Sequence, residues 1–293
     1  MRNVAFVVLA VFAAIAAGVV YERAERRADD KRLPRIGQAI DIGGRSLNIY
    51  CSGEGGPAVI LSAGAPLSGY SWIAAQRKIA TFTQACWYDR AGFGWSDPGP
   101  DPRDSAASAQ DLHELLRHAG IAPPYILVGE RFAGLDMRVY AGRYPQEVAG
   151  LVLVDNVPDD EATNPRSRGA LPQFLRYPQN LLAQTLNQFG LVRLLGLGSS
   201  RYRFSARPGS FTAEEWAKLT ALRDEPKTRT SLLQEKPAES IVEARAAGKG
   251  GARPVVELNS EGANLILYYS PDAVAGAVRE VTSREAKSSQ IAQ

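Results

Sequence analysis

The side chains best suited to acid–base, thiol or metal chemistry are scarce in this chain of 293 residues, which holds two histidines and two cysteines. Cys51 and Cys86 form no CxxC pair and share no ligand spacing with the histidines, which argues against a zinc or iron–sulfur site. His113 and His118 lie on a predicted helix, each about 110° from the centre of its apolar stripe. We therefore expect both imidazoles on solvent-facing flanks, away from a site at the strand ends.

Apolar runs and amphipathic segments alternate along the chain and define the elements that would position a site. A hairpin with a Gly43-Gly44 turn is predicted over 40–51, and buried strands over 59–61, 85–89, 125–129, 150–155 and 254–258. Helices are predicted between the strands, over 104–119 and 132–144, and after Ser270. This order predicts an α/β fold with a mostly parallel central sheet flanked by helices.

Residues 161–253 break this pattern, because they hold helical stretches at 172–186, 191–197 and 212–224 but no clear buried strand. Insertions of this size in a sheet protein usually form a lid beside the site. We therefore assign a core to 38–160 and 254–285, a helical lid to 161–253 and a tail to 286–293.

Charge is unevenly divided between these parts. The lid segment carries a net charge of +7, whereas 38–160 and 254–293 together carry −7. The whole chain has a net charge of only +3, which does not indicate a nucleic-acid binder.

The first 21 residues do not belong to the folded core. Val4 to Val20 is a run of 17 residues without a charge, long enough as a helix to cross a bilayer. We expect a single-pass membrane anchor over 1–21, followed by a charged linker over 22–37. The alternative is a cleaved signal peptide with Ala14-Ile15-Ala16 as its processing site, and hence an exported protein. Basic residues after the apolar run weakly favour a cytoplasmic body for the anchored form.

Three motifs resemble the α/β-hydrolase superfamily, specifically its small serine hydrolase and peptidase-like branch. They are the loop YDRAGFGWSD over 88–97, the strand PYILVG over 124–129, and the strand GLVLVD over 150–155. The resemblance runs from about Ile40 to Val281. It implies the α/β-hydrolase fold, with a nucleophile on a sharp turn between a strand and a helix.

The family's turn has the sequence G-x-S-x-G, with the serine hydroxyl exposed for attack. Here it is Gly129-Glu130-Arg131-Phe132-Ala133, so an arginine occupies the nucleophile position. Arginine stays protonated and cannot attack a carbonyl, and Glu130 is offset by one residue. Arg131 either fills an abandoned pocket through a salt bridge, or binds an anion at the start of a helix.

The other two members of the family's triad are also altered. The resemblance places the histidine seven residues before Pro271, where Asn264 stands, and asparagine is not a general base. The acid position corresponds to Asp155, or one strand later to Asn259-Ser260-Glu261. Only five residues separate Leu258 from Asn264, too few for the acid loop, helix and strand that the family places there. Either Val255–Leu258 is the last strand, or 265–269 forms a replacement.

The family's oxyanion donors survive in outline. They correspond to the turn at Gly64 and Ala65 and to the backbone of Phe132, with Glu130 beside them. We predict a non-catalytic relative of serine hydrolases that keeps a ligand-binding pocket. The alternative is an active hydrolase of small esters or amides with a non-standard catalytic set.

We expect neither a cofactor nor a metal. The positive charge of Arg131 and of the lid suits a small anionic ligand. The net charge of −7 on the core favours the alternative, in which Arg131 pairs with a core carboxylate such as Asp155. Cys51 and Cys86 fall at strand positions and are interpreted as small core residues.

Overall fold

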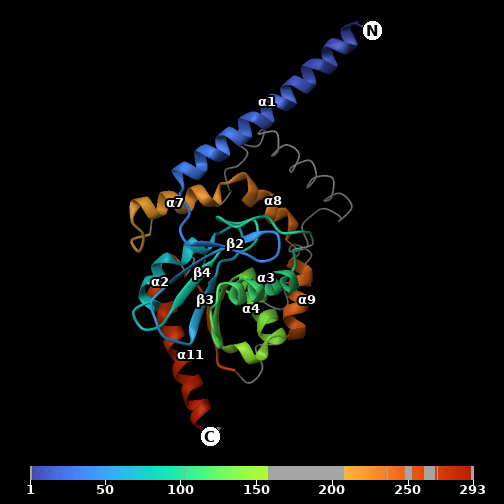
Figure 1. Cartoon of the computed structure of the whole chain (residues 1–293). Helices are drawn as coiled ribbons and strands as arrows, with labels where there is room; N and C mark the ends of the chain where they lie inside the picture. Colours follow the sequence, from blue (N-terminus) through green and yellow to red (C-terminus); the bar gives the residue numbers. More distant parts are fainter. Residues whose placement is uncertain are drawn as a thin grey trace.

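The computed structural model describes residues 2–101, 103–157, 208–235, 237–247, 253–260, 268 and 270–291. Figure 1 shows one sheet-centred body, from which the N-terminal helix projects. The sheet contains seven strands in the order β1-β2-β4-β3-β5-β6-β7. Their bounds are Gln38–Asp41, Ser46–Ser52, Ala58–Ser62, Ala85–Tyr88, Tyr125–Glu130, Val148–Val154 and Val255–Leu258 for β1 to β7.

The sheet is parallel from β4 to β7, whereas β1 and β2 form an antiparallel hairpin and β2 pairs antiparallel with β4. This arrangement confirms the predicted mostly parallel α/β fold. Asp41 stabilises the predicted turn because its Oδ1 accepts hydrogen bonds from the amides of Gly43 and Gly44, both at 2.9 Å. β7 pairs in parallel with β6 and is the last strand of the described chain.

Helices cover both faces of the sheet. On one face, α2 (Ile73–Ile79) and α11 (Pro271–Ile291) contact each other and the strands. On the other face, α3 (Ser105–His118) and α4 (Phe132–Arg143) pack together. Two buried hydrophobic clusters, one on each face, fill the space between the layers. α3 begins where expected, because the Asp104 side chain accepts a hydrogen bond from the Ala107 amide.

Three helices are described in the second half of the predicted lid: α7 (Ala213–Arg223), α8 (Pro226–Gln234) and α9 (Pro237–Ala247). α7 opens with the capping box that Thr212 and Glu215 make at its first turn. α9 packs against α3 and α4 and so belongs to the helical layer of that face. The predicted helices at 172–186 and 191–197 lie outside the described residues.

The loop after β4 is organised around the buried carboxylate of Asp89. It accepts hydrogen bonds from the amides of Gly69 at 2.7 Å and Trp95 at 2.9 Å, and from Asn48 Nδ2 at 3.1 Å. A β-carbon at Gly94, whose φ is +51°, would lie 2.3 Å from the Asp89 carboxyl carbon. The loop can therefore close over Asp89 only with a glycine at position 94.

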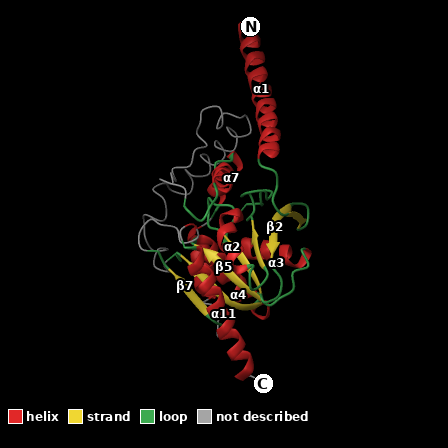
Figure 2. Cartoon of the chain, turned by 90° about the vertical axis from the view of Figure 1, so that its left-hand side faces the viewer, coloured by secondary structure: helices red, strands yellow, loops and turns green. Residues whose placement is uncertain are grey.

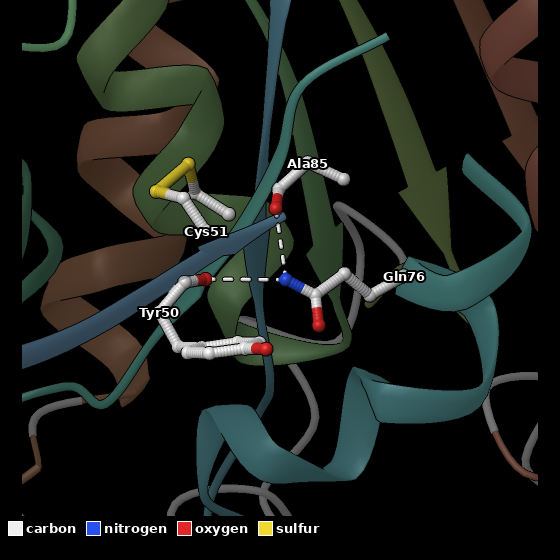
Figure 3. Close-up of a disulfide and its surroundings, with 5 residues drawn as sticks. Tyr50, Cys51, Gln76 and Ala85 are labelled. Atoms are coloured by element: carbon white, nitrogen blue, oxygen red, sulfur yellow. Dashed lines mark hydrogen bonds between the residues drawn. A yellow bond between two sulfur atoms is a disulfide. The ribbon is translucent and has the colours of Figure 1, made fainter. Parts of the chain in front are cut away.

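Cys51 and Cys86 are bonded to each other, which corrects their interpretation as separate small core residues. They lie directly opposite one another on the antiparallel strands β2 and β4. Figure 3 shows the neighbouring Gln76 side chain of α2, whose Nε2 donates to the carbonyls of Tyr50 at 3.2 Å and Ala85 at 2.8 Å. Covalent and hydrogen-bonded links thus join the hairpin to the rest of the sheet.

The N-terminal helix α1 runs over Arg2–Arg32 and points away from the body, as Figures 1 and 2 show. It includes both the apolar run and most of the predicted charged linker. Phe6, Leu9 and Phe12 are exposed, at 73%, 69% and 66%. In the part of the chain that the structure describes, no helix reaches the length and apolarity needed to cross a membrane. The membrane anchor therefore stays a prediction.

Candidate functional site

The turn between β5 and α4 keeps the backbone form of a nucleophile elbow although it carries no serine. β5 ends at Glu130, α4 begins at Phe132, and the single residue between them, Arg131, has φ 51° and ψ −119°. The Arg131 amide donates to the Val154 carbonyl at 2.9 Å, which ties the turn to β6. A β-carbon at Gly129 would lie 2.7 Å from the Ala133 carbonyl oxygen, so glycine is required below the turn.

The Arg131 side chain is exposed at the tip of this turn. It forms no ion pair with any carboxylate of the described residues, Asp155 included. Among the described residues, the structure thus brings Arg131 and Asp155 into no ion pair, and it shows no salt bridge that would hold Arg131 as a plug of the pocket. The guanidinium is instead free to meet a ligand from solvent.

Asp155 stands at the end of β6, with φ 48°. Its Oδ1 accepts a hydrogen bond from the Ser260 amide at 2.7 Å, and its own amide donates to the Leu258 carbonyl. These bonds join the ends of β6 and β7. The hydrogen bond from Ser260 gives the Asp155 carboxylate a structural role at this end of the sheet. Asn264, which occupies the position of the triad histidine, lies outside the described residues.

Glu130 lies completely buried beneath the elbow and reaches the turn after β3. Its Oε2 accepts a hydrogen bond from the Gly64 amide at 2.8 Å, while its Oε1 finds no hydrogen-bond partner among the described residues. Burial raises the pKa of Glu130 to about 7, partly opposed by the Gly64 hydrogen bond and by the charge of Arg131. The sequence placed Glu130 beside the turn at Gly64 and one residue from the nucleophile position, but it did not predict this hydrogen bond.

The turn after β3 lies directly against the elbow, as the family resemblance implied. A β-carbon at Gly64 would lie 2.8 Å from the Glu130 carbonyl oxygen and 3.3 Å from the Arg131 β-carbon. Within the described chain, the amides of Ala65 and Phe132 donate to no acceptor. Two backbone donors and the first turn of α4 therefore border the position that Arg131 occupies.

Arg90 links this turn to two other parts of the molecule. Its Nε donates to the Ala63 carbonyl at 3.1 Å, and its Nη1 lies 3.3 Å from Asp136 Oδ2 on α4 and 2.8 Å from Glu235 Oε1 after α8. Asp136 also accepts from the Ser105 hydroxyl at 2.6 Å. Burial raises the pKa of Asp136 to about 7, against the charge of Arg90.

A cavity of about 20 Å³, room for roughly one water molecule, lies beside this network and is bordered by Phe132. Sequence reasoning did not identify the network, although the Tyr88-Asp89-Arg90 motif contains its central arginine.

The two histidines lie away from the elbow, on α3. His113 Nδ1 is 3.2 Å from Glu147 Oε2, and its ring stacks on Tyr144 with 4.0 Å between the ring centres. His118 is exposed, and its Nδ1 contacts the Asp41 carbonyl at 2.6 Å. Both imidazoles are thus bound to outer elements, as their helical positions predict. Among the described residues, no group of His, Cys, Asp or Glu side chains could hold a metal ion.

Comparison with known proteins places this fold and turn in one family. Residues 57–225 match the family model described as alpha/beta hydrolase fold, more than half of the chain. The chain therefore belongs to the α/β-hydrolase fold family. Among solved structures, the epoxide hydrolase CorEH is similar, with a TM-score of 0.58 and 17% identity over 85% of this chain and 98% of CorEH.

The haloalkane dehalogenase DbeA from Bradyrhizobium elkani has a TM-score of 0.57 and 20% identity, over 84% of this chain and 98% of DbeA. At this identity, both likenesses concern the fold alone.

Curated relatives match only part of this chain. The uncharacterized protein YbdG of Bacillus subtilis is 26% identical over 144 residues, 46% of this chain and 42% of YbdG. The protein named "Putative carbamate hydrolase RutD" of Klebsiella pneumoniae is 37% identical over 103 residues, 34% of this chain and 38% of RutD. The matched segments thus span less than half of either relative.

Proposed function

We propose that this protein is a non-catalytic member of the α/β-hydrolase fold family, and that its elbow binds a small carboxylate or phosphate-type anion. The observation that carries the proposal is the exposed Arg131 guanidinium at the nucleophile position, which forms no ion pair with the described residues. An anion there would meet a fixed positive charge, the amides of Ala65 and Phe132, and the positive end of the α4 dipole. Arginine suits this role because its planar group can bind two anion oxygens at once.

The same residues argue against acyl transfer by the family's usual route. A guanidinium has no lone pair available for attack, and asparagine at position 264 has no titratable base. The remaining amide donors would stabilise an oxyanion by about 3 kcal/mol each, but without a nucleophile no such oxyanion forms.

The proposal is tested with purified full-length protein. We expect no labelling by a fluorophosphonate and no hydrolysis of p-nitrophenyl esters above background. We expect acetate and sulfate to raise the melting temperature of the wild type more than that of Arg131→Ser, because sulfate also stabilises folded proteins without binding to a site. Arg143→Ser is the matched control, because Arg143 is an exposed arginine in the last turn of the same helix. If anions stabilise Arg131→Ser as much as the wild type, the elbow does not bind them.

The second candidate is an active hydrolase of small esters or amides with a non-standard catalytic set. It is favoured by the similarity to RutD and by two buried carboxyls near the elbow, Glu130 and Asp136, whose pKa values of about 7 suit proton transfer. Turnover that persists in Arg131→Ser but is lost in Glu130→Gln would support this candidate over the binding protein.

We further propose that α1 anchors the protein in a membrane, with the folded domain on the oxidising side. The exposed apolar side chains of the projecting helix support the anchor, and the Cys51–Cys86 disulfide supports an oxidising compartment, since such bonds rarely persist in the cytosol. The basic residues after the apolar run weakly favour the cytoplasmic side instead, so the disulfide and the charge distribution point to opposite orientations.

We expect the full chain to stay in the membrane fraction after carbonate washing and deletion of residues 1–21 to release it. In untreated cells, Cys51 and Cys86 should resist alkylation until a reductant is added. Cysteines that are alkylated without reductant would place the domain in the cytosol.

A further inference from the structure

The buried carboxyl of Glu130 contacts the turn that borders the proposed anion site. It forms the last residue of β5, directly before Arg131, and its carboxyl crosses to the turn after β3. Its two oxygens differ: Oε2 accepts the Gly64 amide hydrogen, whereas Oε1 is enclosed without a partner. A proton on Oε1 would leave the Gly64 hydrogen bond intact, because the carbonyl-like Oε2 remains an acceptor.

The charges that act on Glu130 come from each element packed around it. Arg131 on the elbow and Arg90 after β4 favour its ionised form, as does the Gly64 hydrogen bond after β3. Asp155 at the end of β6 favours the protonated form, in the same direction as burial. Arg131 is therefore both the proposed anion-binding group and one of the charges that hold the Glu130 carboxyl ionised.

We propose that Glu130 makes anion binding at Arg131 proton-coupled, so that binding of an anion shifts Glu130 toward its protonated form and draws protons from solvent. This inference rests on the proposed function and adds the regulation of that site by pH. A bound anion would neutralise the field of Arg131 and add a negative charge close to the buried carboxylate. Both changes favour the protonated carboxyl, which is neutral and does not repel the anion.

The direction of the pH dependence follows from linkage. The free protein has a Glu130 pKa of about 7, and the bound protein would have a higher one. Affinity is then greatest below the free pKa and falls as pH rises, until the carboxyl is ionised in both states. A rise of one unit on binding corresponds to a tenfold loss of affinity across this window.

The test measures the affinity of full-length protein for sulfate and acetate between pH 6 and pH 8.5, where neither probe titrates. We expect the wild type to lose about tenfold in affinity over this range, with the proton uptake visible as a dependence of the calorimetric heat on the buffer. Glu130→Gln, which keeps an acceptor for the Gly64 amide, should bind with nearly constant affinity. Glu114→Gln, which alters a partly exposed carboxylate on α3 that pairs with Arg117, should retain the wild-type profile.

The outcomes separate this inference from the function on which it rests. Anion binding to the wild type that is independent of pH, without proton uptake, overturns the role of Glu130 and leaves the binding function standing. Absence of anion binding at every pH removes both. The calorimetric proton count needs only the wild-type protein, so the inference stays testable even if Glu130→Gln fails to fold.

Discussion

Replacing Arg131 by glycine should stabilise the folded protein at the expense of the proposed anion site. The backbone of Arg131, at φ 51° and ψ −119°, is a mirror image of the extended region and is costly for any residue with a β-carbon. Such conformations cost about 1–3 kcal/mol, and a cation at a helix N-terminus adds about 0.3–1 kcal/mol. The greater unfolded-state entropy of glycine removes about 0.4–1 kcal/mol of the gain. Because the side chain is exposed, little packing is lost.

The net prediction for Arg131→Gly is a gain of about 1–3 kcal/mol in the free energy of unfolding. For a domain of this size, each kcal/mol raises the melting temperature by about 2–4 °C. Urea unfolding followed by circular dichroism would measure the change. Arg131→Ala is the control, because it removes the charge but keeps the β-carbon. Relative to the wild type, its free energy of unfolding should rise only by the contribution of the helix dipole, up to about 1 kcal/mol.

The reasoning would be refuted by a glycine variant that is no more stable than the alanine variant. That result would mean that the elbow conformation carries no penalty at position 131. A glycine variant that is less stable than the wild type would mean that the arginine side chain makes stabilising contacts.

Three further perturbations test the buried groups and the disulfide. Asp89→Ala removes three hydrogen bonds, leaves the buried amides of Gly69 and Trp95 unpaired, and should lower the free energy of unfolding by about 3 kcal/mol or more in urea titrations. Burial raises the pKa values of Asp89 to about 6 and of Glu130 and Asp136 to about 7, so between about pH 4 and pH 7 the folded state binds more protons than the unfolded state. Stability should therefore fall as pH rises through this window, and Asp136→Asn should flatten the fall measured by thermal unfolding at a series of pH values. Replacing Cys51 by Ser together with Cys86 by Ala opens a loop of 35 residues and should cost about 4 kcal/mol, an effect that a reductant should reproduce in the wild type.

Local sequence signals were enough to predict most elements of the fold. The apolar run at 125–129 became β5, and the Thr212-to-Glu215 capping box starts α7, because both signals depend on neighbouring residues. The disulfide could not be predicted in this way. It depends on β2 lying beside β4 with Cys51 opposite Cys86, a register set by strand pairing between segments 35 residues apart.

The candidate site shows the same division between local and distant information. The sequence identified Arg131 as the residue at the elbow, since the motif around it is contiguous. Its solvent exposure was not predicted, because the choice between Asp155 and solvent depends on how the ends of β5 and β6 are oriented. The contact from Glu130 to Gly64 was also missed, since it joins two strands that are 66 residues apart in sequence.

The disulfide also has a mechanical consequence, because the N-terminal helix enters the sheet through β1 and β2 at its edge. A force applied to α1 would load this hairpin first and peel β1 and then β2 away from β4. The bond between Cys51 and Cys86 would stop the peeling at position 51, so that only the chain before that residue could be drawn out. Further extension would require rupture of the interior strands. The disulfide therefore keeps a force applied to α1 from reaching the elbow, which lies on β5 beyond β4 and β3.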